Sequence, residues 1–229
     1  MMLSTTEKKK IFFEQQALLI LKHKYPERFS GLQHVGYDKS PDLQDPNTSV
    51  GIEVTTVLIY QECCALFNMY YGKKVPEDSK EKVDSILQSN LCQFHYDEDD
   101  HVECMYAYIA IDLSPAQVSE IAGEPIISTG QKKIDKLNKG HYDRFNTNGL
   151  FMFTSNNTFP KTIGKNVAIL ARYQKEKEKK FDVFYVFRSS SPHDTLYAFN
   201  KDGICIDIQY LSNSGILSLQ AEEIAGLYS

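Results

Sequence analysis

The sequence has no tryptophan, only five cysteines, and no apolar run approaching the roughly 18–20 residues that a bilayer-spanning helix requires. The odd number and the spacing of the cysteines do not match a disulfide framework. Three lysines close the segment Met1–Lys10, and Glu14-Gln15-Gln16 interrupts Ile11–Leu21, which excludes a signal-peptide core. We therefore expect a reduced, cytoplasmic protein with no membrane partner.

Two nucleotide-binding signatures are also missing, because neither G-x-x-x-x-G-K nor G-x-G-x-x-G occurs in the chain. What the chain does have is enough apolar material for a core: 42% of its 229 residues are hydrophobic, with 14 Tyr and 13 Phe. This composition excludes global disorder, and the length predicts a single domain, 1–229, that carries an insertion.

Basic residues are not in excess overall, since the net charge is −5. An even distribution of this charge would argue against a partner rich in phosphate. However, the net charge is 0 over 1–60, −9 over 61–127, +8 over 128–180 and −4 over 181–229. The basic segment can therefore contact phosphates, and nucleic acid stays open as a partner.

The N-terminal part predicts a long helix. Ser4 and Glu7 have capping-box spacing, and the helix should run from Glu7 to Lys24, before Pro26. At 100° per residue Glu14 falls on the apolar face of this helix. Two interpretations are open: a functional carboxylate, or a residue at the rim of that face paired with Lys10 or Lys22.

The stretch 32–58 is rich in β signals. Ser40-Pro41 predicts an extended approach to Asp42, and Asp45-Pro46-Asn47 is typical of a turn. In the strand that follows, Val50, Ile52 and Val54 share one face, while Gly51, Glu53 and Thr55 share the other. A hairpin is the expected arrangement.

Helical and strand periodicities alternate through the rest of the chain. We expect an α/β fold with a mixed β-sheet flanked by helices. The expected helices are Gln61–Tyr71, Asp78–Phe94, Ser128–Lys139 and Ile163–Lys177, and the expected strands are Met105–Leu113, Leu150–Thr154, Phe181–Phe187 and the hairpin Leu196–Phe199 with Ile204–Tyr210.

Asp42 and Glu53 form the most informative pair. They are 11 positions apart, and antiparallel pairing of their segments would bring the two carboxylates close together. Adjacent carboxylates repel unless a proton or a cation lies between them. Mg²⁺ or Mn²⁺ suits such a pair, since Mg²⁺ takes one or two protein carboxylates and accepts phosphate oxygens. The simpler interpretation is that Asp42 caps a turn and Glu53 is an exposed strand residue.

Pro41-Asp42, a short gap and Glu53-Val54-Thr55 after a helix that carries Glu14 resemble the PD-(D/E)XK nuclease superfamily. The resemblance implies a restriction-endonuclease-like core of a helix, three strands, a helix and a strand. This core would cover residues 5–60 and 128–190, with 61–127 as a helical and strand insertion. Residues 191–229 would add a C-terminal hairpin.

By this resemblance Asp42 and Glu53 would bind the metal, the Val54 carbonyl would complete its shell, and Glu14 would assist. The superfamily usually has Lys two residues after the acidic residue, whereas Thr55 stands there in this chain. In many members with a Glu-x-Thr pattern, a basic residue reaches the site from the following helix.

The candidates for that basic residue are Lys133 first and Lys136 second, which flank Ile134 and Leu137. The alternative for each is a solvated helix lysine.

The function implied is a Mg²⁺- or Mn²⁺-dependent endonuclease that hydrolyses phosphodiester bonds, with DNA favoured over RNA and a homodimer left open. The rival hypothesis is a decayed nuclease-like fold that serves as a nucleic-acid or protein interaction module; Thr55 supports it. An enzyme acting on a small molecule is the third.

Cys92, His95, His101 and Cys104 have the spacing C-x2-H-x5-H-x2-C, so a structural zinc site is one hypothesis. The short central gap favours the other hypothesis, in which the cysteines are core residues and the histidines lie in a loop.

Overall fold

A computed structural model describes residues 4–36, 40–57, 60–89, 92–107, 114–140, 142, 145–154, 157–190 and 193–227. Its helices are α1 (Thr5–Lys24), α2 (Pro26–Phe29), α3 (Tyr60–Tyr70), α4 (Glu77–Ser89), α5 (Pro115–Asn138), α6 (Pro160–Gln174) and α7 (Ser214–Ala225). Its strands are β1 (Gln33–His34), β2 (Leu43–Asp45), β3 (Val50–Thr56), β4 (Cys92–Tyr96), β5 (Val102–Ala107), β6 (Thr147–Thr154), β7 (Val183–Arg188), β8 (Asp194–Asn200) and β9 (Cys205–Leu211). No helix in these ranges is long and apolar enough to cross a membrane.

Seven strands form one sheet in the order β1-β2-β3-β6-β7-β8-β9. The central strands β3, β6 and β7 run parallel, and the outer pairs on both sides are antiparallel. This arrangement confirms the expected α/β fold with a mixed sheet. The burial of the strands is consistent with this topology. The central strands β6 and β7 are buried along most of their length, as expected for strands covered on both faces.

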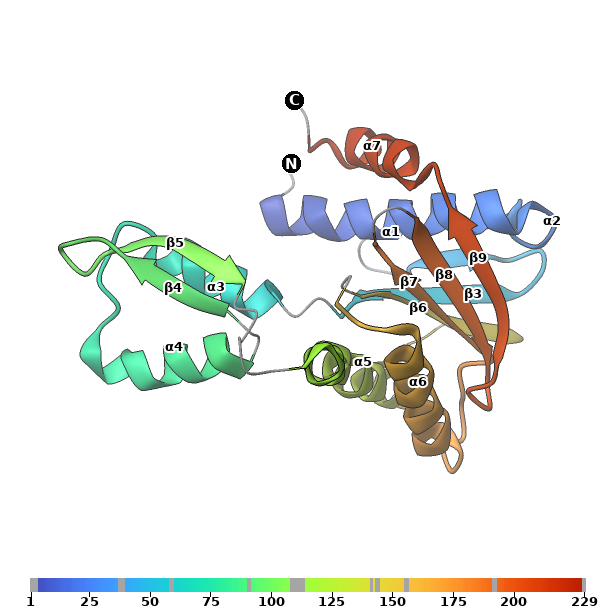
Figure 1. Cartoon of the computed structure of the whole chain (residues 1–229). Helices are drawn as coiled ribbons and strands as arrows, with labels where there is room; N and C mark the ends of the chain where they lie inside the picture. Colours follow the sequence, from blue (N-terminus) through green and yellow to red (C-terminus); the bar gives the residue numbers. More distant parts are fainter. Residues whose placement is uncertain are drawn as a thin grey trace.

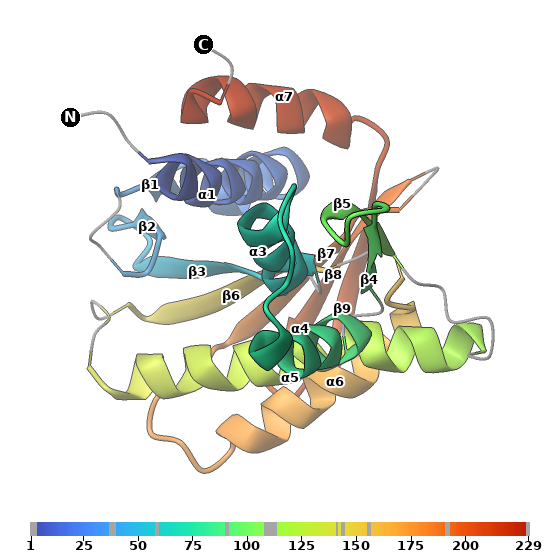
Figure 2. The same cartoon turned by 90° about the vertical axis from the view of Figure 1, so that its left-hand side faces the viewer.

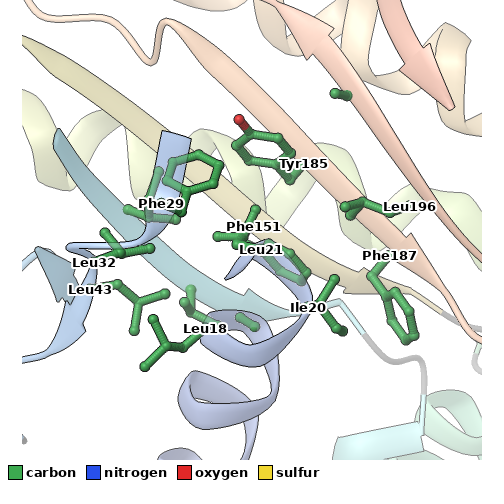
Figure 3. Close-up of a cluster of buried hydrophobic side chains, with 14 of the residues drawn as sticks. Leu18, Ile20, Leu21, Phe29, Leu32, Leu43, Phe151, Tyr185, Phe187 and Leu196 are labelled. Atoms are coloured by element: carbon green, nitrogen blue, oxygen red, sulfur yellow. The ribbon is translucent and has the colours of Figure 1, made fainter. Parts of the chain in front are cut away.

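Helices cover both faces of the sheet (Figure 1). α1 packs on one face, where Leu21, Phe151 and Tyr185 belong to a large buried cluster (Figure 3). α5 and α6 pack on the other face around Ile134, Leu170 and their neighbours. The sheet is therefore the middle of three layers, and α7 lies outside α1.

Residues 60–107 build a smaller unit from α3, α4 and the antiparallel pair β4–β5 (Figure 2). It has its own hydrophobic cluster, which includes Val83, Leu87 and Phe94. The helix expected over Asp78–Phe94 ends at Ser89, and its last part is strand β4. Burial of Cys92 and Phe94 alternates with exposure of Gln93 and His95, and this period of two favours the strand.

The helix expected to begin at Ser128 begins at Pro115. Ser114 and Gln117 form a capping box at this earlier start, a signal that the sequence prediction did not use. Pro125 lies inside the helix, where it removes one backbone hydrogen bond at a cost of about 3 kcal/mol. Buried packing of Ala122 and Ile126 offsets this cost, so the helix continues through Pro125.

The C-terminal hairpin forms as β8 and β9 and extends the main sheet. The helix α7, which follows it, was not anticipated. Its buried residues Leu217, Ala221 and Ala225 recur at helical spacing and face α1, while Ile216, Leu219 and Ile224 are exposed. The apolar residues on both sides of α7 obscured the one-sided pattern that identifies a helix.

Candidate functional site

Asp42 and Glu53 lie at the β2–β3 pair of strands, next to the edge strand β1. β2 and β3 pair with Leu43 opposite Ile52, so one further step in the same register sets Asp42 opposite Glu53. Asp42 is held there because the Val54 N–H donates to its Oδ2 at 2.8 Å. Both carboxylates are buried, with 3% and 1% of each residue exposed, so Glu53 is not an exposed strand residue.

Glu14 reaches the same place from α1. It is 2% exposed, and its two oxygens have different partners. Oε2 lies 2.6 Å from His34 Nε2, and Oε1 lies 3.3 Å from Lys10 Nζ. Lys10 Nζ is also 3.5 Å from Asp42 Oδ1, so this lysine bridges the two acids. Glu14 thus pairs with Lys10, as one hypothesis expected, but it does so in a buried position.

Two lysines reach Glu53 from α5, on the opposite side of β2 and β3 from α1 (Figure 2). Lys133 Nζ lies 2.6 Å and Lys136 Nζ 3.2 Å from Glu53 Oε1. They occupy one face of the helix because they are three residues apart. Lys136 Nζ also donates to Ser40 Oγ at 3.0 Å. Both candidate lysines therefore contact Glu53, and the charge of Lys133 also acts on Asp42.

One carboxylate oxygen of Glu53 is an unused hydrogen-bond acceptor. Within the described part of the chain, Oε2 is buried and accepts no hydrogen bond. The buried phenol of Tyr142 lies near this carboxylate. Burial and then the charge of Glu53 raise the pKa of Tyr142, so this phenol stays neutral. A carboxylate oxygen with an unused acceptor inside the protein is a position that suits a cation.

The pKa values of Glu14 and Asp42 are shifted in opposite directions. Burial, and next the charge of Glu14, raise the pKa of Asp42 above its ordinary value of 3.8, despite the Val54 N–H and Lys10. Burial would also raise the pKa of Glu14. There the His34 hydrogen bond and the Lys10 charge outweigh it, so the pKa of Glu14 lies below 4.5. At neutral pH the charge of Glu14 therefore stabilises the folded protein, whereas the charge of Asp42 destabilises it.

These directions predict stability changes of opposite sign. At pH 7 in a chelator, Asp42→Asn is expected to raise the unfolding temperature, because the amide still accepts from Val54 and removes a costly charge. Glu14→Gln is expected to lower it. A change of about 1 kcal/mol would move the unfolding temperature of a chain this size by roughly 2–4 °C. Thermal unfolding of both variants beside the wild type measures this.

The pH dependence follows from linkage. The raised pKa of Asp42 means that its contribution to stability is present below pH 3.8 and lost as the pH rises through the folded-state pKa. The lowered pKa of Glu14 means that its contribution is present above pH 4.5 and lost as the pH falls through the folded-state pKa. The advantage of Asp42→Asn should therefore vanish in acid. Destabilisation by Asp42→Asn at pH 7 would contradict this account.

Sequence reasoning missed three participants in this site: His34, Tyr142 and the bridging role of Lys10. The pair of Lys10 with Glu14, four residues apart on α1, was among the expectations, but the contact of Lys10 with Asp42 was not. His34 and Tyr142 gave none, because each comes from a segment whose approach to the acids depends on the packed fold. Within the described ranges, no group of three His, Cys, Asp or Glu residues is arranged to hold a metal ion.

The Cys92, His95, His101 and Cys104 quartet does not converge. Cys92 is 2% exposed inside the β4–β5 unit, whereas His95 lies on the other face of β4. His101 lies in the turn, where its N–H and ring contact Asp97. Because a tetrahedral zinc site needs four ligands around one point, this placement is incompatible with the zinc hypothesis.

The comparisons with known proteins yield no match: no protein-family model fits the chain, and no curated protein or solved structure is significantly similar to it.

Proposed function

We propose that this protein is a metal-dependent nuclease with a restriction-endonuclease-like core, which hydrolyses phosphodiester bonds in DNA. The observation that carries the proposal is that Asp42 and Glu53 are both buried at the β2–β3 pair and that Lys133 Nζ lies 2.6 Å from Glu53. An acidic pair beside a lysine is the set of groups that this chemistry uses. Here the lysine comes from α5, so Thr55 at the usual lysine position does not leave the site without a cation.

The order of the elements supports the same proposal. The helix α1, the antiparallel strands β1–β3, the helix α5 and the strand β6 follow one another, with the unit of residues 60–107 between β3 and α5. This is the helix, three strands, helix, strand order of the superfamily. The acids lie on the second and third strands of that order or directly beside them, as the resemblance implies.

The side chains fit a magnesium or manganese ion. Asp42 and Glu53 would hold it, with Glu53 Oε2 as the unused acceptor. The Val54 carbonyl would be a third ligand, because the N–H and C=O of one strand residue point to the same side and this N–H points to Asp42. Such an ion lowers the pKa of a bound water and neutralises charge on a phosphate.

Other side chains would also take part in the proposed reaction. Lys133 and Lys136, with 23% and 40% of their side chains exposed, can reach a phosphate at the surface while they contact Glu53. Their charges would offset the charge that develops on the phosphate. Glu14, anchored by His34 and Lys10, would fix the position of the neighbouring Asp42.

Two measurements test the proposal. Calorimetric titration with Mn²⁺ should show saturable binding that is lost in Asp42→Asn, and supercoiled plasmid DNA should be nicked or linearised only with Mg²⁺ or Mn²⁺. Mn²⁺ binding without cleavage of DNA or RNA would contradict the assigned activity. Absence of both would favour the decayed interaction module.

A further inference from the structure

A second region of the molecule has the features of a ligand site. A cavity of about 340 Å³ lies where β6 and β7 end, between α1 and the N-terminal part of α7. In open α/β sheets, ligands bind in the crevice outside the carboxyl ends of the parallel strands. Glu14, Asp42 and Glu53 do not line this cavity, so it is separate from the acidic site.

Three aromatic rings form one wall of the cavity. Phe13 from α1 lies 5.1 Å from Phe153 of β6, and Phe153 lies 5.5 Å from Phe187 of β7, measured between ring centroids. Phe153 and Phe187 are almost completely buried, whereas Phe13 is partly exposed. The planes of the first pair are tilted by 56° and those of the second by 71°, so the rings pack against each other at steep angles and give this wall a fixed apolar shape.

Polar groups face the same space. Gln16 of α1 is 8% exposed, yet its side-chain amide makes no hydrogen bond to any described residue. Asp194 Oδ1 accepts from the Ser190 N–H at 2.7 Å and from the Ser189 hydroxyl, whereas its Oδ2 has no partner among the described residues. These groups line the cavity, so a ligand there can hydrogen-bond to them in place of water.

From this lining we propose that the cavity binds a nucleobase or an unphosphorylated nucleoside. The phenylalanine wall suits a flat heteroaromatic ring. The Gln16 amide can donate to a ring nitrogen or carbonyl and accept from an N–H, and Asp194 Oδ2 can accept from an exocyclic amino group. A nucleobase has both a flat ring and a polar edge, and the polar edge distinguishes it from a purely apolar ligand.

The size and charge of the cavity narrow the choice. At about 340 Å³ the cavity is near the small end of ligand pockets, which span roughly 300–1,000 Å³, so it suits one base or nucleoside. Asp194 is the charged residue in the lining, and no lysine or arginine is among the described lining residues. A phosphate would therefore meet a negative charge without a compensating cation, which disfavours nucleotides.

Calorimetric titration of the full chain in a chelator tests this site without using the metal. Adenosine, guanosine and cytidine are the probes, and saturable binding of at least one is expected. Its monophosphate should bind about tenfold more weakly. Asp194→Asn, which keeps an acceptor for Ser190, should reduce that difference.

Matched variants locate the binding. Gln16→Leu should weaken the nucleoside by about tenfold, as expected for the loss of one or more buried hydrogen bonds. Gln15→Leu, the neighbouring residue outside the cavity lining, should bind like the wild type. Ser218→Phe should fill the cavity and abolish binding, with Gln220→Phe on the exposed face of α7 as its control.

Three results would overturn the proposal: no saturable binding of any probe, equal binding by Gln16→Leu and wild type in folded protein, or unchanged binding by Ser218→Phe. Circular dichroism and the unfolding temperature of each variant show that the comparison is made on folded chains. Because all titrations are free of metal, failure here leaves the nuclease proposal standing, and failure of DNA cleavage leaves this one standing.

Discussion

Replacing Glu53 with glutamine is expected to slow metal-dependent DNA cleavage strongly while the protein stays folded. Glutamine has almost the same shape but no charge, so it cannot neutralise a divalent ion or hold Lys133 and Lys136. We expect the cleavage rate to fall by about two to three orders of magnitude, the scale seen when one preorganised group that stabilises the transition state is removed. The rate of plasmid nicking in Mg²⁺ measures this.

Asp135→Asn is the matched control for this experiment. Asp135 lies on α5 and pairs with Lys177 at 2.8 Å, so its replacement also removes a carboxylate from an ion pair, but at an exposed place away from Glu53. Its cleavage rate should equal that of the wild type. Full activity of folded Glu53→Gln would rule out the assigned site, while equal losses in both variants would point to a general effect of charge.

Replacing Lys133 with methionine is the second change for which we expect a large loss, of about one to two orders of magnitude in cleavage rate. The Lys133 ammonium is the closer of the two to Glu53, at 2.6 Å against 3.2 Å for Lys136, and it is also less exposed. Lys136→Met should therefore have the smaller effect. Methionine keeps an unbranched apolar side chain in place of the lysine stem, so helix α5 should persist.

A lysine at position 55 is expected to restore part of the activity that Lys133→Met removes. Thr55 lies on the same face of β3 as Glu53, because strand side chains alternate with a period of two. Adding Thr55→Lys to Lys133→Met would put a cation two residues after the acidic residue, and we expect part of the activity to return. Lys132→Met, an exposed neighbour on α5, serves as the control. Lys133→Met with wild-type activity would assign the lysine role elsewhere.

The local parts of this site could be predicted from the sequence because local rules govern them. The capping box at Ser4 starts α1, and the buried carboxylate of Glu14 follows from the position of that residue on the apolar face. The turn after Asp45 and the alternation in β3 determine which residues of the hairpin oppose each other. The register that sets Asp42 against Glu53 is therefore a consequence of short-range chemistry.

Prediction was least successful where long-range packing opposes a local preference. Pro125 reads as a break, but the packing of α5 against α6 and the capping box at Ser114 keep one continuous helix. Cys92 lies in a stretch read as helical, but it forms a strand because β5 is available as a partner. In both places the free energy of tertiary contacts exceeds the intrinsic preference of the segment.

The sequence by itself determined the α/β class, the acidic pair and the two lysines worth testing. Only the tertiary structure decided that these lysines, 80 or more positions from Glu53, meet one of its oxygens, and that Lys10 joins Glu14 to Asp42. The same holds for the cavity between α1, α7 and the ends of β6 and β7. The physical reason is that periodicity specifies which face of an element is buried, whereas the neighbours of that face depend on how the elements pack together.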